Sequence, residues 1–198
     1  MSITNTAQFL HERFNPGDEW VPPVRVKGYT RTELAKLFAE LGFQHGAEVG
    51  VAEGRYSKVL CEHIPGLKLR CVDLWGPYEK KGAADQDKAW ELAHQALQPY
   101  TVEFMRGPSV QMAEAVPDGS LDFVYIDADH RFDFVMQDLI VWSRKVRKGG
   151  IVAGHDYYRF RGAGVVLAVE TFVQAHRIHE WFLDDQRETS FFWAHEWN

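Results

Sequence analysis

Runs typical of β-strands alternate with runs typical of α-helices along most of the chain, and this alternation constrains the fold more than any other feature. Strands are expected at residues 47–51, 67–74, 101–107, 121–127 and 151–156. Helices are expected at residues 30–41, 55–64, 85–97, 109–115, 132–146 and 164–176. Such an alternation predicts an open, mostly parallel sheet that is covered by helices on both faces.

The last two strand-like runs, 179–185 and 189–197, follow one another without a helix between them. Because parallel strands need a much longer connection, this pair is expected to be an antiparallel hairpin. The predicted fold class is therefore α/β, with a Rossmann-like doubly wound sheet of seven strands that is mostly parallel and ends in an antiparallel hairpin.

The chain of 198 residues is expected to form a single domain, in which residues 1–42 are an N-terminal extension and helix. Residues 1–28 contain several prolines and glycines and are expected to be irregular. The Gly149-Gly150 pair is expected to cap the helix at 132–146.

A glycine-rich bend, GAEVGVAEGRYS at residues 46–57, follows the first strand of this alternation. It matches neither the P-loop pattern nor the dinucleotide pattern G-x-G-x-x-G, but reads E-x-G-x-x-x-G from Glu48 through Gly50 to Gly54. Negative charge on Glu48 and Glu53 would repel a pyrophosphate and attract an ammonium or sulfonium group. The alternative is a plain strand-to-helix turn whose glycines only allow close packing.

The ends of the next two strands complete a candidate nucleoside site. Asp73 lies 23 positions after Gly50, close to the spacing at which doubly wound folds place an acid on the ribose hydroxyls. Trp75 is positioned to lie against a flat base, and Gly107 and Ser109 reach the same edge. Each has a simpler interpretation: Asp73 as a loop cap, Trp75 as core, and Gly107 as part of a turn.

These motifs and the order of elements resemble the class I S-adenosylmethionine-dependent methyltransferases over roughly residues 43–198. The resemblance implies that the glycine turn holds the methionine end of S-adenosylmethionine and that Asp73 holds its ribose. The cofactor-binding residues that it implies are Glu48, Gly50, Val51, Ala52, Gly54, Asp73, Leu74, Trp75, Gly107, Ser109 and Asp127.

The segment from Val124 to Tyr157 resembles a narrower branch, the small-molecule O-methyltransferases that act on sugars, antibiotics and catechols, some with a metal. Its features occur here as Asp127, Asp129, His130, Asp138-Leu139, Gly149-Gly150 and Asp156. The resemblance implies methyl transfer to a small-molecule acceptor, at a hydroxyl oxygen.

Acids and histidines follow the fourth and fifth expected strands, so they should converge at one edge of the sheet. Asp127 and Asp156 are candidate ligands for Mg²⁺, which would lower the pKa of an acceptor hydroxyl. Alternatively, His130 or His155 acts as the general base, and Asp127, His130 and His155 are the catalytic candidates. The simpler interpretation is that Asp127 contacts only the cofactor and that Asp129 caps the next helix.

Composition limits the partners. The net charge of −6 and sequence pI of about 5.8 argue against nucleic acid, and no apolar run reaches the length of a membrane span. The N-terminus lacks the pattern of a secretory signal, and Cys61 and Cys71 fit reduced core thiols, so a cytoplasmic location is expected. A homo-oligomer is left open.

Three segments could cover the acceptor: the N-terminus, residues 76–85 and residues 157–164. They carry basic and aromatic side chains that suit an acidic or cyclic acceptor, or are solvated loops: Arg25, Lys27, Lys80, Lys81, Tyr157, Tyr158, Arg159 and Arg161. Two other functions stay open, a non-catalytic nucleoside-binding module and an NAD(P)-dependent oxidoreductase, and the absence of G-x-G-x-x-G counts against the second.

Overall fold

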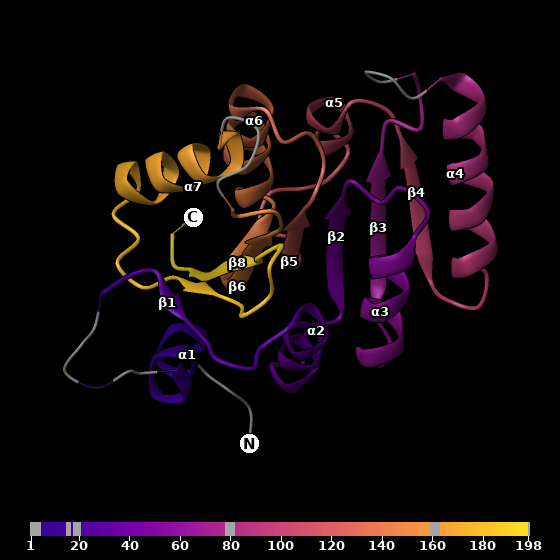
Figure 1. The fold of residues 1–198 in the computed structure, drawn as a ribbon. Coiled ribbons are helices and arrows are strands. Elements are labelled where there is room, and N and C mark those ends of the chain that lie inside the picture. Colours follow the sequence, from indigo (N-terminus) through magenta and orange to yellow (C-terminus); the bar gives the residue numbers. More distant parts are fainter. Residues whose placement is uncertain (1–4, 15–16, 18–20, 78–81, 159–162, 198) are drawn as a thin grey trace.

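The computed structural model describes residues 5–14, 17, 21–77, 82–158 and 163–197 (Figure 1). Its strands form one sheet in the order β1-β7-β8-β6-β5-β2-β3-β4. The strands are β1 (Val24–Arg25), β2 (His45–Val49), β3 (Lys68–Asp73), β4 (Val102–Arg106), β5 (Leu121–Ile126), β6 (Val146–Gly154), β7 (Phe182–Leu183) and β8 (Phe191–His195). The helices are α1 (Thr6–Phe14), α2 (Arg31–Glu40), α3 (Arg55–His63), α4 (Ala83–Leu97), α5 (Ser109–Ala113), α6 (Phe132–Ser143) and α7 (Gly164–Ala175).

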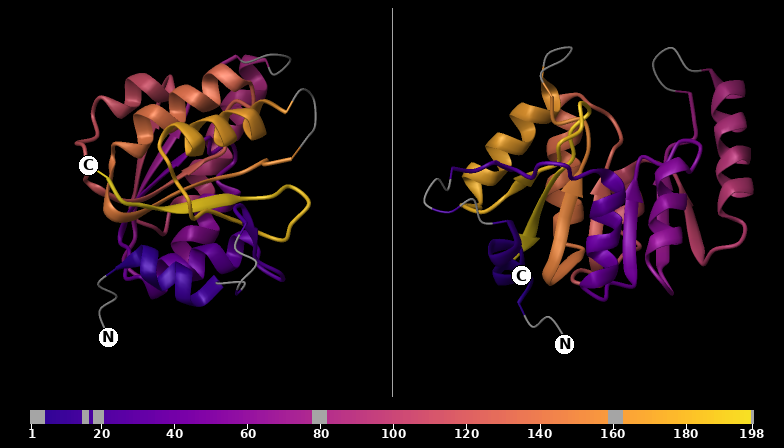
Figure 2. Two further views of the ribbon diagram at one scale, coloured as in Figure 1. Left: turned by 90° about the vertical axis from the view of Figure 1, so that its left-hand side faces the viewer. Right: turned by 60° about the horizontal axis from the view of Figure 1, so that its bottom comes forward.

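The helices cover both faces of the sheet, as the alternation predicts (Figures 1 and 2). One buried cluster joins the sheet to α1, α2, α3 and part of α4, and it includes Phe38 stacked on Phe123 with ring centroids 4.4 Å apart. The second cluster joins the opposite face to α5, α6 and α7. Because both faces are buried, β5 and the second half of β6 are almost continuously apolar.

The terminal hairpin is confirmed. β7 and β8 are antiparallel, with Phe182 opposite Phe192, and β8 also runs antiparallel to β6. The other pairs, from β4 across to β6, are parallel. The fold class is thus α/β and mostly parallel, as expected.

The strand count of seven is wrong, because the N-terminal extension adds an eighth strand to the sheet. β1 pairs in parallel with β7 through bonds from Val24 N to Trp181 O (3.0 Å) and from Val26 N to Leu183 O (2.8 Å). The expectation that residues 1–28 are irregular also missed α1, which buries Leu10 against the sheet.

The Gly149-Gly150 pair is not a helix cap. Helix α6 ends at Ser143, and both glycines lie within β6. A Cβ at Gly150 would lie 2.4 Å from the Asp122 carbonyl oxygen, so close approach to β5 explains this glycine.

Strand order places the site. Along the chain, β2, β3 and β4 extend the sheet in one direction, while β5 and β6 extend it in the other. The order therefore reverses between β2 and β5. In open α/β sheets, ligands bind outside the carboxyl ends of the strands at such a switch point.

Candidate functional site

The glycine turn after β2 touches the end of β5. Gly50 has a φ of 97°, and a Cβ there would lie only 2.1 Å from the Asp127 carbonyl oxygen. Hydrogen bonds from Gly50 N to Val72 O (2.8 Å) and from Asp127 N to Val49 O (2.7 Å) hold the backbones in place. Only glycine fits this position, both for its backbone conformation and for the space available.

Asp73 is bonded to the glycine turn. Its Oδ2 accepts hydrogen bonds from Val51 N (2.9 Å) and Ala52 N (2.8 Å), and its Oδ1 accepts one from Trp75 N (2.9 Å). The carboxylate therefore fixes the turn from the end of β3. Gly54 follows as the N-cap of α3. The glycine turn and Asp73 meet as the sequence predicts, in the geometry of the loop-cap interpretation.

Trp75 does not present a surface to a base. It is fully buried, its indole nitrogen donates to Ala52 O at 2.9 Å, and it packs edge-on against Trp90. The core interpretation of this residue is therefore the right one, because the turn and α4 cover the ring. Its neighbour Leu74 is 41% exposed and carries the apolar surface at this strand end.

Glu48 is buried rather than charged at the surface. Only 2% of the residue is exposed, and the Ser57 hydroxyl donates to its carboxyl group. Burial raises the pKa of Glu48 to about 8, so the group is largely protonated at neutral pH. The expected negative charge on Glu48 is therefore absent in this state, and half-buried Glu53 pairs with Arg55 at 2.8 Å.

Gly107 and Ser109 lie at the end of β4, next to Asp73. Gly107 N donates to Asp73 O at 2.9 Å, and the Ser109 hydroxyl donates to Asp138 of α6. Burial raises the pKa of Asp138 to about 6. The Asp-Leu pair of the sequence thus contributes a carboxyl group that orients Ser109.

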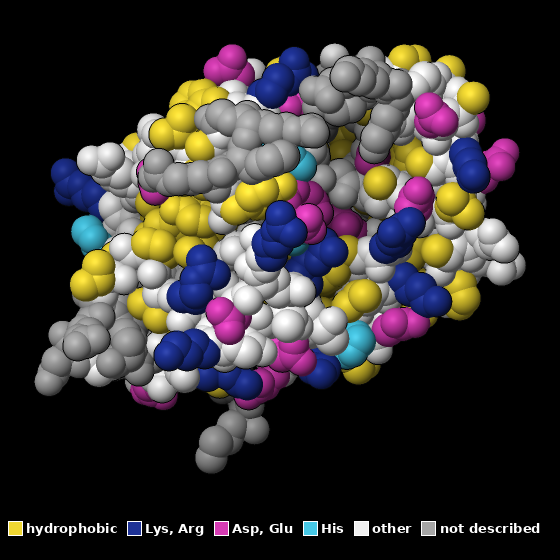
Figure 3. All heavy atoms as spheres, viewed as in Figure 1, with side chains coloured by type: hydrophobic (Ala, Val, Ile, Leu, Met, Phe, Trp, Pro, Cys, Tyr) yellow, Lys and Arg dark blue, Asp and Glu magenta, His cyan; other side chains and the backbone are white. Residues whose placement is uncertain are grey.

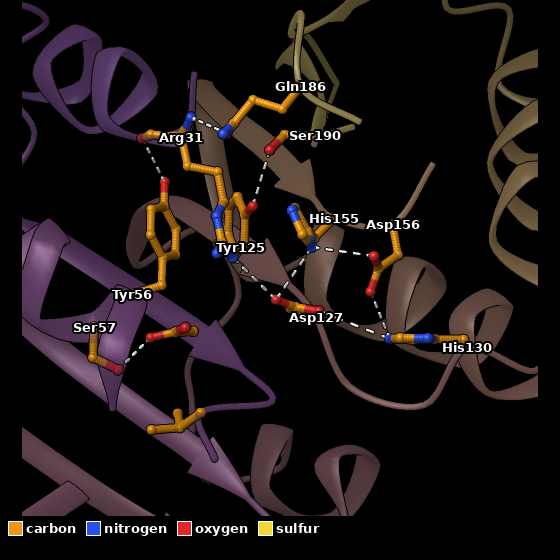
Figure 4. Close-up of polar contacts among 12 residues, drawn as sticks. Arg31, Tyr56, Ser57, Tyr125, Asp127, His130, His155, Asp156, Gln186 and Ser190 are labelled. Atoms are coloured by element: carbon orange, nitrogen blue, oxygen red, sulfur yellow. Dashed lines mark hydrogen bonds and ion pairs between the residues drawn. The ribbon is translucent and has the colours of Figure 1, made fainter. Parts of the chain in front are cut away.

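An acid–histidine cluster, made of Asp127, His130, His155 and Asp156, forms as predicted at the ends of β5 and β6 (Figure 4). His130 Nε2 lies 2.9 Å from Asp156 Oδ2 and 3.8 Å from Asp127 Oδ1. His155 Nδ1 lies 3.6 Å from Asp127 Oδ2 and 3.4 Å from Asp156 Oδ1. Figure 3 shows acidic and histidine side chains together at a hollow on this face, with basic side chains beside them.

The electrostatics of the cluster are strongly coupled. Hydrogen bonds to Asp127 and Asp156 raise the pKa of His130 to about 10. Burial alone would raise the pKa of Asp156, but its hydrogen bonds with His130 and His155 hold that pKa below its usual range. Asp156 also has a left-handed backbone, with a φ of 58°. Strained backbone of this kind is concentrated at functional sites.

Asp127, His130 and Asp156 can present ligand atoms that all lie within 4.8 Å of one another. Two carboxylates and an imidazole form a donor set that a divalent cation can use. Asp129 is outside this group, because it accepts hydrogen bonds from the backbone and guanidinium of Arg131 at the start of α6. Asp129 thus has a structural role just before α6, but it is not the expected helix cap, because it bonds to the N-cap residue Arg131 itself and α6 has no side-chain cap.

Sequence reasoning missed Arg31. Its Nη1 lies 3.5 Å from Asp127 Oδ2, and its guanidinium carbon lies 5.0 Å from the centre of the Tyr56 ring. It occupies the first position of α2, where a cation opposes the helix dipole. This unfavourable placement of a cation is the one feature of the sequence that could have singled out Arg31.

The expected acceptor-binding side chains are only partly described. Arg25 donates to Asp184 O at 2.7 Å, and Tyr157 donates to Glu170 at 3.1 Å, so both are engaged within the fold. Lys27 and Tyr158 are exposed and half-buried, respectively. The remaining basic residues of that expectation lie outside the described residues: Lys80, Lys81, Arg159 and Arg161.

The protein thus has a doubly wound α/β fold, with a glycine turn and an acid–histidine cluster at the switch point where such folds bind ligands. A family model described as a methyltransferase domain matches residues 47–157, more than half of the chain, and the chain belongs to this family. No curated protein matches the chain in sequence.

Solved structures share the fold. An O-methyltransferase from Bacillus cereus in complex with SAH has a TM-score of 0.63 at 15% identity, with 94% of each chain covered. TomG, an O-methyltransferase from Streptomyces achromogenes involved in tomaymycin synthesis and solved with SAM, has a TM-score of 0.59 at 16% identity. There, 94% of this chain and 86% of that chain are covered. Within the described residues, no helix is long and apolar enough to cross a membrane.

Proposed function

We propose that this protein transfers the methyl group of S-adenosylmethionine to a hydroxyl oxygen of a small-molecule acceptor. One observation carries the proposal: the glycine turn of a methyltransferase-family chain touches the strand end that bears the acid–histidine cluster. A cofactor at the turn and an acceptor at the cluster would be neighbours, as in-line transfer requires. The bound SAH and SAM of the similar structures support this choice of cofactor.

The turn and the adjacent strand ends fit such a cofactor. Asp73 accepts three hydrogen bonds, and a carboxylate has about four acceptor sites, which leaves capacity for a ribose hydroxyl. Leu74 offers exposed apolar surface where an adenine would lie. S-adenosylmethionine supplies an already activated methyl group, so the protein has to align the acceptor oxygen and take up its proton.

The cluster fits the acceptor side of this reaction. A divalent cation such as Mg²⁺, held by Asp127 and Asp156 with His130 beside them, would lower the pKa of an acceptor hydroxyl. Without a cation, a pKa of about 10 keeps His130 protonated at neutral pH, so it cannot take up the proton of the acceptor hydroxyl. His155, in contact with both carboxylates, is the better candidate to receive a proton directly.

A small-molecule acceptor suits the chain better than a polyanion. The net charge of −6 opposes binding to nucleic acid and to anionic membrane surfaces. Within the proposal, the acceptor is therefore a free small molecule rather than a nucleic acid or a lipid.

The test measures methyl transfer from S-adenosylmethionine to a panel of catechol, phenol and sugar hydroxyls by mass spectrometry. We expect methylated product that is lost in EDTA and restored by Mg²⁺. Asp156→Asn should remove most of the activity, whereas Asp133→Asn, exposed on α6 and outside the cluster, should retain it.

Binding of S-adenosylhomocysteine without product from any acceptor class would favour a non-catalytic binding module. Full activity in EDTA would contradict the metal and favour His155 as the base. Binding of NAD(P) in place of S-adenosylhomocysteine would overturn the choice of cofactor.

A further inference from the structure

We propose that Arg31 binds the α-carboxylate of the methionine end of the cofactor and so selects for an intact amino-acid group. This inference rests on the proposed function, because it assigns a contact to the cofactor of that function. Arg31 lies in α2, which precedes β2, the strand that leads into the glycine turn.

The charge of the ligand creates the need for such a residue. A methionine end carries both an ammonium and a carboxylate. The carboxylates of Asp127 and Asp156 in the cluster suit the ammonium, but they repel the carboxylate. The backbone N–H groups of Val51 and Ala52, which could have bound a carboxylate, already donate to Asp73 at 2.9 and 2.8 Å. The carboxylate therefore needs a different donor.

Arg31 occupies the right place for that donor. Its guanidinium pairs with Asp127 at 3.5 Å, and the Asp127 backbone carbonyl is the atom that a Cβ on Gly50 would strike. Arg31 is thus next to the meeting point of the glycine turn and β5. Figure 4 shows its side chain extending from α2 toward Asp127, beside Tyr125 and Tyr56.

The surroundings hold Arg31 in position before any ligand binds. The Tyr56 ring lies against the guanidinium, and the Tyr56 hydroxyl donates to Arg31 O at 3.1 Å. Arg31 N donates to Gln186 Oε1 at 2.9 Å, which ties α2 to the loop between β7 and β8. A fixed guanidinium loses less side-chain entropy on binding, and its planar fork matches a carboxylate.

The side chain also has donors to spare. A guanidinium offers five N–H groups, and here its ion pair with Asp127 involves one terminal nitrogen, Nη1. One third of the side chain is exposed, so a ligand can reach it. A cation in the first turn of a helix works against the helix dipole, and a bound carboxylate would relieve that cost.

The experiment compares two ligands by calorimetry on the full chain. S-adenosylmethionine has the carboxylate, whereas decarboxylated S-adenosylmethionine keeps the sulfonium and the ammonium but lacks it. In Arg31→Gln we expect the affinity for S-adenosylmethionine to fall roughly 10- to 100-fold, the value of a charge-assisted hydrogen-bonded pair. The affinity for the decarboxylated ligand should stay within about twofold of the wild type.

Two variants make the result specific. Arg31→Lys keeps the charge without the fork and should fall between the wild type and Arg31→Gln. Lys36→Gln removes an exposed cation of the same helix, paired only with Glu33 at 3.2 Å in the described contacts, and should change neither affinity. If Arg31→Gln does not fold, Arg31→Lys carries the comparison.

Equal loss of both ligands, or no loss of S-adenosylmethionine, in Arg31→Gln would overturn the role of Arg31 while leaving the proposed function intact. A wild-type protein that binds neither ligand would overturn the proposed function itself.

Discussion

At the scale of single residues, burial determines the chemistry of Glu48. The group lies in β2 with Ser57 of α3 as its hydrogen-bond donor, and burial raises its pKa from 4.5 to about 8. The unfolded chain ionises this side chain near pH 4.5, but the folded chain holds the proton until about pH 8. The folded state therefore binds more protons across this range, and stability falls as the pH rises through it.

Glu48→Gln should remove this pH dependence, because the amide resembles the protonated acid and cannot ionise. We expect the free energy of unfolding of the wild type to fall by on the order of 4 kcal/mol between pH 5 and pH 8 from this group. The variant should lose much less and be the more stable protein at pH 8. Urea unfolding at several pH values measures the difference.

Glu53→Gln is the matched control, since the Glu53 side chain is only half-buried and pairs with exposed Arg55. Parallel stability curves for the wild type and Glu48→Gln would contradict a protonated Glu48. Glu48→Ala is a poorer test, because it would leave a cavity and a Ser57 hydroxyl without its partner.

Residue types and spacing located Asp73, Asp127, His130, His155 and Asp156 at one edge, because parallel strands bring their carboxyl ends together. Spacing could not reveal the environment of each side chain. The charge of Glu48 and the exposure of Trp75 both depend on what packs over them, and these two expectations failed for that reason.

At the scale of elements, the N-terminal extension is part of the core. Helix α1 places Leu10, which is 1% exposed, against the sheet, and the Thr6 hydroxyl donates to Gly149 O at 2.5 Å. The His11 ring contacts Glu180 at 2.9 Å, which connects the helix to the segment before β7. The extension therefore stabilises the antiparallel end of the sheet.

Leu10→Ala should accordingly destabilise the whole domain by about 2–5 kcal/mol, the cost of truncating a buried leucine. Gln8→Ala on the exposed side of the same helix should cost less than about 1 kcal/mol. Chemical denaturation of both variants provides the measurement. A Leu10→Ala protein as stable as the wild type would show that α1 is peripheral to the core.

The sequence allowed the central elements to be predicted, because apolar runs mark the five strands and apolar residues at helical spacing mark the helices between them. It did not reveal α1 or β1. A strand of two residues has no periodicity, and β1 exists because Val24 and Val26 donate to the β7 edge. The terminal hairpin was predictable because the short connection excludes parallel pairing.

At the scale of the whole molecule, the reversal of strand order between β2 and β5 explains why the site lies where it does. Loops from β2, β3 and β4 form one side, and loops from β5 and β6 form the other. Since the two sides come from opposite halves of the sheet, a ligand that contacts both should add to the stability of the entire fold.

S-adenosylhomocysteine at about 100 times its Kd should therefore stabilise the folded state by roughly 2.7 kcal/mol. For a chain of this size, that corresponds to an increase in Tm of about 5–10 °C. NADP should give no increase at the same concentration, because the turn lacks the pattern that holds a pyrophosphate. The Gly50→Ala variant should show no increase over its own ligand-free Tm, because the added Cβ occupies the junction of the turn and β5. An unchanged increase in that variant, measured by differential scanning calorimetry, would place the ligand somewhere other than the switch point.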